Sequence, residues 1–363
     1  MSATLPARRS WRSAATAVRS RAVRLAELAA TPLVPADYLD LLDPLRSGAA
    51  LRGRIVAVTP ETADAVTLTI EAGRAWAGHV PGQYVRIGVD VDGVRQWRAY
   101  SVTSAPGGRR FTLTVKAMPG GVVSNHLVHH ATVGTVVQLD QACGEFVIPA
   151  PQSTRALFIT AGSGITPVMG MLRSHDLGDV VLVHSAPMPT DVVFGSELRA
   201  LAAAGRIRLV ERHTDTDGML DVTELTELVP DLVERSAWAC GPTGLLDALD
   251  GYYDGLGIPE RLTTERFRPS VLVTGDGGAV TFSRSGAVVE ADGATPLLDA
   301  GEAAGVLMPS GCRMGICFGC VVPLREGAVR DLRTGDLITA AAGDGVLVQT
   351  CVSAAAGACD LDL

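Results

Sequence analysis

Four cysteines near the end of the chain have the spacing of an iron–sulfur ligand set. Cys312, Cys317 and Cys320 form the pattern C-x4-C-x2-C on one short segment, and Cys351 follows further along the chain. This is the ligand arrangement of a plant-type [2Fe-2S] cluster. Three glycines in the same segment let the loop turn back on itself, because glycine has no Cβ. Such a cluster transfers single electrons, so the rest of the chain must supply them.

Two other uses of cysteine agree less well with this pattern. A zinc site is usually built from two C-x2-C-like pairs, whereas here three cysteines share one loop. Disulfides are typical of secreted proteins, and nothing in the sequence marks this chain as secreted. The remaining cysteines, Cys143, Cys240 and Cys359, lie outside the motif.

Length and charge limit the class of protein. A chain of 363 residues suits two to three domains. Its net charge of −8 argues against a general nucleic-acid binder. No apolar run approaches the roughly 18 to 20 residues that span a bilayer, and the N-terminus lacks the apolar core of a signal peptide. We therefore expect a cytoplasmic protein.

The first segment, residues 1–50, differs from the rest. Arginines crowd residues 8–28, where apolar residues recur at helical spacing, so we predict a basic amphipathic helix. It can lie on an anionic membrane at the inner face of the cell membrane, dock on a partner, or pack on this protein's own domains. A second short apolar segment follows, with Tyr38, Leu39, Leu41, Leu42 and Leu45.

Residues 51–150 alternate between apolar and polar positions in several short runs, which predicts a small antiparallel β-barrel. Within this segment, Tyr100 can stack on a flavin ring, Ser101 can hydrogen-bond the ring edge, and Arg98 can bind a phosphate. The pair Gly120-Gly121 opens a predicted helix, whose first N–H groups, with the Ser124 hydroxyl, suit a pyrophosphate.

Residues 151–272 change to buried strands alternating with helices, the pattern of an α/β domain with a parallel sheet. A strand runs into a turn with Gly162 and Gly164 and then into a helix with Thr166, a geometry that binds dinucleotide phosphates. Proline at 167 departs from the G-x-G-x-x-G pattern. The sequence Cys240-Gly241-Pro242 follows a strand, at the edge where such sheets bind ligands.

The last segment, residues 273–363, combines short strands, one helix and the cysteine loop. That combination suits a ferredoxin-like β-grasp domain. The fold class expected for the whole chain is multidomain α+β: an antiparallel flavin barrel, a parallel-sheet nucleotide domain and a ferredoxin domain.

These three blocks, in this order, resemble the ferredoxin–NADP reductase superfamily, in particular members with a C-terminal plant-type ferredoxin domain. The resemblance implies an NAD(P)H-dependent oxidoreductase that passes electrons through FAD to the [2Fe-2S] cluster. It implies that Arg98, Tyr100 and Ser101 hold the flavin, that the loop with Gly120, Gly121 and Ser124 meets its pyrophosphate, and that the turn with Gly162, Gly164 and Thr166 meets the nicotinamide nucleotide. Cys240-Gly241-Pro242 would flank the nicotinamide ring, and Glu265 and Phe267 would lie near the flavin. Tyr100, Ser101, Cys240 and Glu265 are the expected catalytic residues.

The basic extension makes the chain look most like actinobacterial reductases that supply membrane-bound acyl-CoA desaturases of the stearoyl-CoA type. A reductase component of a soluble oxygenase or hydroxylase is the alternative, and a non-catalytic [2Fe-2S] redox sensor is an alternative of another class. The nucleotide preference stays open at this point. Asp215 would repel the 2′-phosphate of NADPH, whereas Arg212 close by would attract it.

Overall fold

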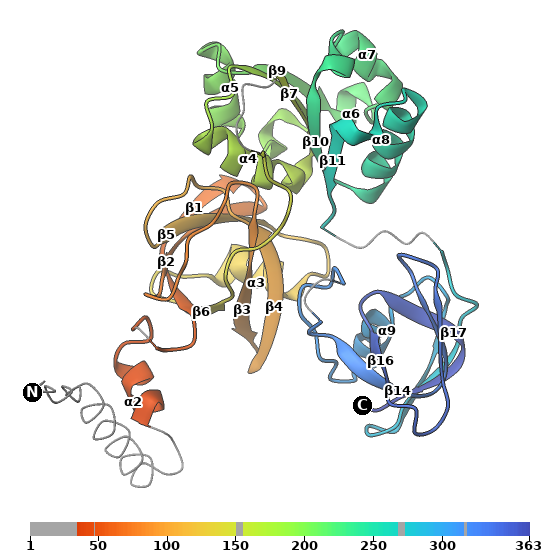
Figure 1. Ribbon diagram of the computed structural model, residues 1–363. Helices are drawn as coiled ribbons and strands as arrows, with labels where there is room; N and C mark the ends of the chain where they lie inside the picture. The colour runs from red at the N-terminus through yellow and green to blue at the C-terminus, as the bar shows by residue number, and fades with distance from the viewer. Residues whose placement is uncertain (1–34, 47, 150–154, 268–272, 316–317) are drawn as a thin grey trace, which may run out of the picture.

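The computed structural model describes residues 35–46, 48–149, 155–267, 273–315 and 318–363. They form three separate sheets, each with its own helices (Figure 1). The helix predicted over residues 8–28 and the predicted ligand Cys317 lie outside the described residues. No helix among those described is long and apolar enough to cross a membrane.

The first sheet is a six-stranded antiparallel barrel in the order β4-β3-β6-β1-β2-β5. Its apolar residues alternate toward one core, as the sequence pattern predicts. Helix α3 packs on strands β3, β4 and β5 and is preceded by the Gly120-Gly121 turn. The elements are β1 Arg52–Thr62, β2 Ala65–Ala72, β3 Tyr84–Val91, β4 Val94–Ser101, β5 Arg110–Lys116, α3 Val122–His130 and β6 Val136–Leu139.

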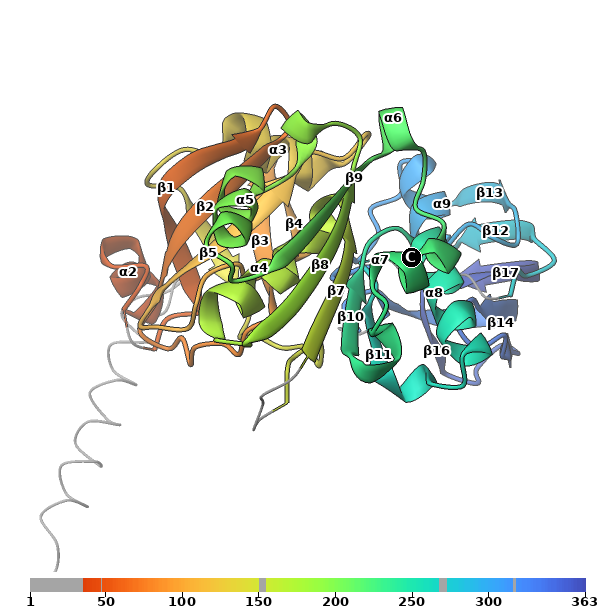
Figure 2. The same cartoon turned by 90° about the horizontal axis from the view of Figure 1, so that it is seen from above.

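The second sheet is parallel, in the order β11-β10-β7-β8-β9, with helices on its faces (Figure 2). Parallel strands end at the same edge, so the turns after β7 and β10 lie together. The elements are β7 Arg155–Ala161, α4 Ile165–Ser174, β8 Asp179–Ala186, α5 Gly195–Ala203, β9 Arg208–His213, α6 Thr214–Asp217, α7 Leu225–Leu228, β10 Ser236–Cys240, α8 Thr243–Gly255 and β11 Leu262–Glu265.

The third sheet has the order β13-β12-β17-β14-β15, with β16 paired to β14. The cysteine loop connects helix α9 to strand β14, and Cys351 follows β16. The elements are β12 Gly278–Phe282, β13 Ala287–Ala291, α9 Leu297–Ala303, β14 Val321–Asp331, β15 Leu337–Ala340, β16 Val346–Gln349 and β17 Ser353–Leu361. The predicted fold class is confirmed in all three parts.

The barrel and the nucleotide domain are packed tightly against each other. Ala65 and Phe146 of the barrel segment belong to the same buried cluster as the residues of α4. A Cβ on Gly170 of α4 would lie 2.4 Å from the carbonyl oxygen of Val102, so only glycine permits this approach. The ferredoxin domain has a core of its own, drawn from residues 280–363.

Helix α2 (Pro35–Leu42) precedes the barrel and lies at its outer end (Figure 1). Leu41 and Leu42 are 76% and 83% exposed, and Tyr38 and Leu39 are also exposed. Leu45, just after the helix, is buried. The second apolar segment predicted from the sequence is thus attached to the fold by Leu45 while its leucine face is uncovered.

Candidate functional site

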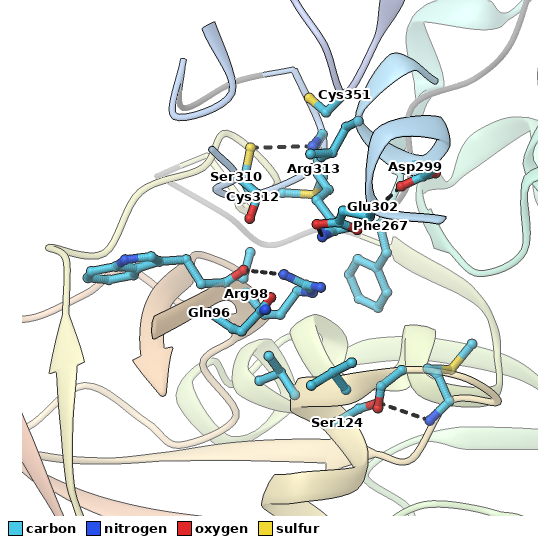
Figure 3. Close-up of a pocket in the computed structure, with 18 of the residues that line it drawn as sticks. Gln96, Arg98, Ser124, Phe267, Asp299, Glu302, Ser310, Cys312, Arg313 and Cys351 are labelled. Atoms are coloured by element: carbon cyan, nitrogen blue, oxygen red, sulfur yellow. Dashed lines mark hydrogen bonds and ion pairs between the residues drawn. The ribbon is translucent and has the colours of Figure 1, made fainter. Parts of the chain in front are cut away.

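A cavity of about 1220 Å³ lies where the three domains meet. Ligand sites commonly measure about 300 to 1,000 Å³, so this one has room for a large cofactor. Its walls come from β4 and the Gly120-Gly121 turn, from the nucleotide domain, and from the segment around the cysteine loop (Figure 3). A molecule bound here would contact all three domains.

Strand β4 contributes Arg98, Tyr100 and Ser101 to this cavity. The Arg98 guanidinium donates to the carbonyl of Trp97 at 2.7 Å, and no carboxylate of the described residues forms an ion pair with it. Burial and then the neighbouring Arg313 lower the pKa of Arg98. The Ser101 hydroxyl is buried without a hydrogen-bond partner in the described part of the chain. A cation and a hydroxyl with unused capacity fit a phosphate and a polar ring edge.

The glycines in the turn before α3 leave its backbone N–H groups accessible to a bound anion. Gly120 has φ +70°, and a Cβ on Gly121 would lie 2.5 Å from the Ser124 hydroxyl. That hydroxyl accepts from the Met118 N–H at 3.1 Å and donates to the Gly121 carbonyl at 3.3 Å. Ser124 therefore braces the turn, and the first N–H groups of α3 are what the turn offers to an anion.

The nucleotide domain presents Ser163 and Thr166 to the cavity. The Thr166 hydroxyl donates to the Ser163 carbonyl at 2.9 Å. A Cβ on Gly164 would lie 2.0 Å from the carbonyl oxygen of Cys240, which explains why glycine stands there. The other residues predicted for this side are not among those that line the cavity: Gly162, Gly164, Cys240, Gly241 and Pro242.

Cys240 and Glu265 are register partners on the parallel strands β10 and β11. Cys240 is fully buried, and burial together with Glu265 raises the pKa of its thiol well above the usual value. Glu265 lines the cavity, and its Oε2 is buried with no partner among the described residues. Burial raises the pKa of Glu265 to about 8, so at neutral pH it is mainly a protonated hydrogen-bond donor. Phe267, two residues on, also lines the cavity.

Three of the four predicted cluster ligands are described. The sulfurs of Cys320 and Cys351 lie 3.2 Å apart, and the Met314 N–H donates to the Cys312 sulfur at 3.3 Å. Cys312 and Cys351 line the cavity. With the fourth predicted ligand undescribed, no group of three metal-binding side chains is found in the described ranges. Sulfur donors with an N–H directed at one of them suit an iron–sulfur cluster.

Two side chains hold the cysteine loop from outside. Arg333 and Gln349 both donate to the carbonyl of Gly315 at 3.1 Å. Gly315 has φ +73°, and a Cβ there would lie 2.5 Å from the Arg333 guanidinium. The glycine is therefore needed both for the turn and for this contact.

Arg313, which follows Cys312 directly, lines the cavity although the sequence did not predict it as a site residue. Its guanidinium forms ion pairs with Asp299 at 3.1 Å and with Glu302, both on α9. Figure 3 shows this group facing Arg98 across the cavity. Its position inside the cysteine motif could have marked Arg313 as a site residue. Its ion-pair partners could not be predicted in this way, because they lie on helix α9.

Arg212, which the sequence left as a candidate for a 2′-phosphate, is already engaged. It pairs with Glu224 at 2.6 Å and donates to the carbonyl of Asp217 at 2.9 Å. Glu224 lies beyond the neighbouring turn, so the residues around Arg212 in the sequence do not reveal this ion pair.

Comparisons with known proteins agree with this arrangement. Residues 55–148 match the oxidoreductase FAD-binding domain family, and residues 280–356 match the 2Fe-2S iron-sulfur cluster binding domain family. An NADPH oxidoreductase of Mycobacterium tuberculosis is 51% identical over 351 residues, covering 94% of this chain and 91% of the relative. The ferredoxin reductase component of a 3-ketosteroid-9-alpha-monooxygenase from the same organism is 32% identical, covering 76% of this chain and 82% of the relative.

Among solved structures, phthalate dioxygenase reductase is similar with a TM-score of 0.57. The similarity covers 86% of this chain and 97% of that protein, at 23% sequence identity. At this identity it demonstrates the shared fold and domain order.

Proposed function

Because this chain belongs to the family of NAD(P)H-dependent reductases that join an FAD-binding domain to a 2Fe-2S domain, we propose that it supplies electrons to an oxygen-dependent iron enzyme. The observation that carries the proposal is the cavity in which Arg98 and Ser101, Glu265, and Cys312 approach one another from three different domains. Electrons that enter at the nucleotide domain can leave through the cysteine loop without crossing a wide gap.

When bound, FAD accepts two electrons as hydride from the nicotinamide and releases them singly to the cluster. We propose that Arg98 binds a flavin phosphate, that Tyr100 packs on the flavin ring, and that the Ser101 hydroxyl meets the ring edge. Protonated Glu265 donates a hydrogen bond into the same space. Cys312, Cys317, Cys320 and Cys351 hold the cluster.

An oxygenase is the first proposed acceptor. The 32% identical relative is by name the reductase component of a monooxygenase, which supports this choice. An iron enzyme of that kind consumes electrons that must arrive from a reductase.

A membrane acyl-CoA desaturase is the second proposed acceptor. It is supported by the exposed leucines of α2, which come after the arginine-rich residues 8–28 in the sequence. Apolar side chains beside a basic segment suit the surface of an anionic membrane, so we also propose peripheral membrane contact there.

NADPH is the proposed nucleotide, since the 51% identical relative is named for it. Two residues favour NADH instead: Asp215 would repel a 2′-phosphate, and Arg212 already pairs with Glu224. A direct measurement can distinguish the two nucleotides. The ratio of kcat/KM for NADPH and NADH, measured with ferricyanide as the acceptor, decides it. A ratio above ten supports NADPH.

The experiment that tests the acceptor uses the purified full-length protein, NADPH or NADH, and two preparations from the host. One is a membrane fraction given stearoyl-CoA, and the other is the soluble fraction given an oxygenase substrate. Desaturation in the membrane fraction supports the desaturase, and hydroxylation only in the soluble fraction supports the oxygenase.

The proposed membrane contact is tested with anionic vesicles. It would be contradicted if a Leu41→Ser/Leu42→Ser variant bound them with the same affinity as the unchanged protein. Val288→Ser, at an exposed site of the ferredoxin domain, is the matched control.

A further inference from the structure

A row of threonine hydroxyls lies on the face of the barrel sheet that points away from the barrel core, because these threonines alternate with core residues along β2 and β5. Thr67 on β2 and Thr114 on β5 are register partners, and their hydroxyl oxygens are 2.7 Å apart. Thr67 is 8% exposed and Thr114 is 4% exposed. This separation is the usual one for a hydrogen bond between two hydroxyl groups.

This row has two different ends. At one end, Thr114 is among the residues that line the large cavity. At the other end, the Thr67 hydroxyl donates to Oε1 of Glu61 on β1 at 2.6 Å. Glu61 is only partly buried, so its carboxylate can exchange protons with solvent. The path from the cavity to this carboxylate therefore has two links, and both are short.

The reaction of the proposed function, on which this inference rests, requires a proton to leave the cavity. Its balance is NAD(P)H → NAD(P)⁺ + 2 e⁻ + H⁺. The electrons depart one at a time through the cluster, which carries no protons. The hydrogen that arrived with its electron pair as hydride must then leave as a proton by another route.

We propose that Thr114, Thr67 and Glu61 conduct this proton from the cavity to solvent. Thr114 accepts a proton on its hydroxyl oxygen while its own proton passes to Thr67. The Thr67 proton passes in turn to the Glu61 carboxylate, which releases it to water. Neither threonine carries net charge before or after the transfer, and rotation of the two hydroxyls restores the starting arrangement.

A side branch of the same row provides a matched control. Thr103 lies 3.5 Å from Thr114, longer than an ordinary hydroxyl hydrogen bond, and its other hydroxyl neighbour is Thr112 at 2.7 Å. Thr112→Val removes a hydroxyl from the same barrel face without interrupting the path to Glu61.

The test measures proton release and electron transfer separately in the FAD- and cluster-loaded protein. Under anaerobic conditions and in weak buffer, a pH-indicator dye follows proton release after mixing with NADPH and ferricyanide. We expect Thr67→Val and Glu61→Gln to slow proton release at least tenfold and to raise the solvent isotope effect on turnover. Thr67→Ser keeps the hydroxyl, so its rate of proton release should stay within about twofold of that of the unchanged protein. Thr112→Val should release protons at the rate of the unchanged protein.

An infrared difference spectrum gives a readout independent of turnover. Reduction of the unchanged protein should produce a transient protonated-carboxyl band that Glu61→Gln lacks. If Thr67→Val fails to fold, Glu61→Gln alone tests the proton path, because Glu61 is only partly buried and its substitution disturbs the fold less.

Normal proton release in Glu61→Gln, with no carboxyl band assignable to Glu61, overturns the inference. The proton would then leave by Lys116, which also lines the cavity and pairs with Asp64 at 2.6 Å, or through the cavity mouth. Failure of the unchanged protein to oxidise either nicotinamide nucleotide is a different result, because it contradicts the proposed function itself.

Discussion

The sulfur atoms of Cys320 and Cys351 lie 3.2 Å apart, although 31 positions separate them in the sequence. The pairing of β14 with β16, in which Val321 is opposite Gln349, brings them together. The Thr350 N–H also donates to the Cys320 carbonyl at 3.2 Å. The distant cysteine is therefore positioned by the sheet, which also bonds to Cys320 at the end of the loop.

Replacing either Cys312 or Cys351 with serine should abolish electron delivery while hydride transfer to FAD continues. The physical reason is that serine is a poor ligand for iron compared with a thiolate. Absorption spectra before and after NADPH addition check both halves of the prediction. Cys359→Ser, at a buried site in the same core, is the control. Full delivery with intact cluster absorption in Cys351→Ser would refute the ligand assignment.

Arg98→Ala should weaken FAD binding by about 10- to 100-fold. A hydrogen bond to a charged group contributes about 1.5 to 3 kcal/mol, and a bidentate contact to phosphate belongs to this class. Fluorescence titration of the apoprotein with FAD measures the dissociation constant. Arg110→Ala, on the neighbouring edge of the barrel with its side chain exposed, should leave it unchanged. Equal affinities of Arg98→Ala and the unchanged protein would remove Arg98 from the phosphate site.

Glu265 should make the apoprotein less stable as pH rises from about 4.5 to about 8. Its pKa is about 8 when folded against 4.5 for the free group, so the folded chain retains a proton that the unfolded chain releases across this window. The loss should be complete above pH 8 and absent below 4.5. Thermal unfolding at a series of pH values should show a flatter dependence for Glu265→Gln. The exposed Glu260→Gln is the control, and parallel curves for all three proteins would contradict the assignment.

Arg313→Gln should lower the midpoint potential of the cluster. The substitution removes a positive charge next to Cys312 together with its ion pairs to Asp299 and Glu302, so a negatively charged reduced state is less well stabilised. Redox titration followed by visible absorption measures the shift, and Arg313→Lys should restore part of it. An unchanged potential in Arg313→Gln would mean that the arginine only shapes the loop.

Much of this arrangement follows from local sequence. The cysteine spacing and the alternating runs of the barrel depend on neighbouring residues, so they predict the fold class and the cluster correctly. The role of Cys240 stays a prediction. Its place at the end of a strand predicts a ligand-facing residue, and in the fold its side chain is fully buried and is not among the residues that line the cavity.

Strand β14 and Arg313 could not be predicted in the same way. The strand contains Pro323 and Gly327, which normally argue against a long strand, and the sheet accommodates them through register shifts near Leu324 and Gly327. Arg313 obtains its role from Asp299, Glu302 and Arg98, three residues that only the tertiary fold brings close.

The arrangement of the buried cores determines which domains can be separated by gene rearrangement. Barrel residues such as Ala65 and Phe146 complete the core beside α4, whereas the ferredoxin domain closes its core with its own residues. The chain thus has three sheets but only two parts that can be exchanged separately: the barrel together with the nucleotide domain, and the ferredoxin domain. A gene rearrangement can add, remove or relocate the tail without uncovering the core beside α4, whereas the first two domains must be passed on together.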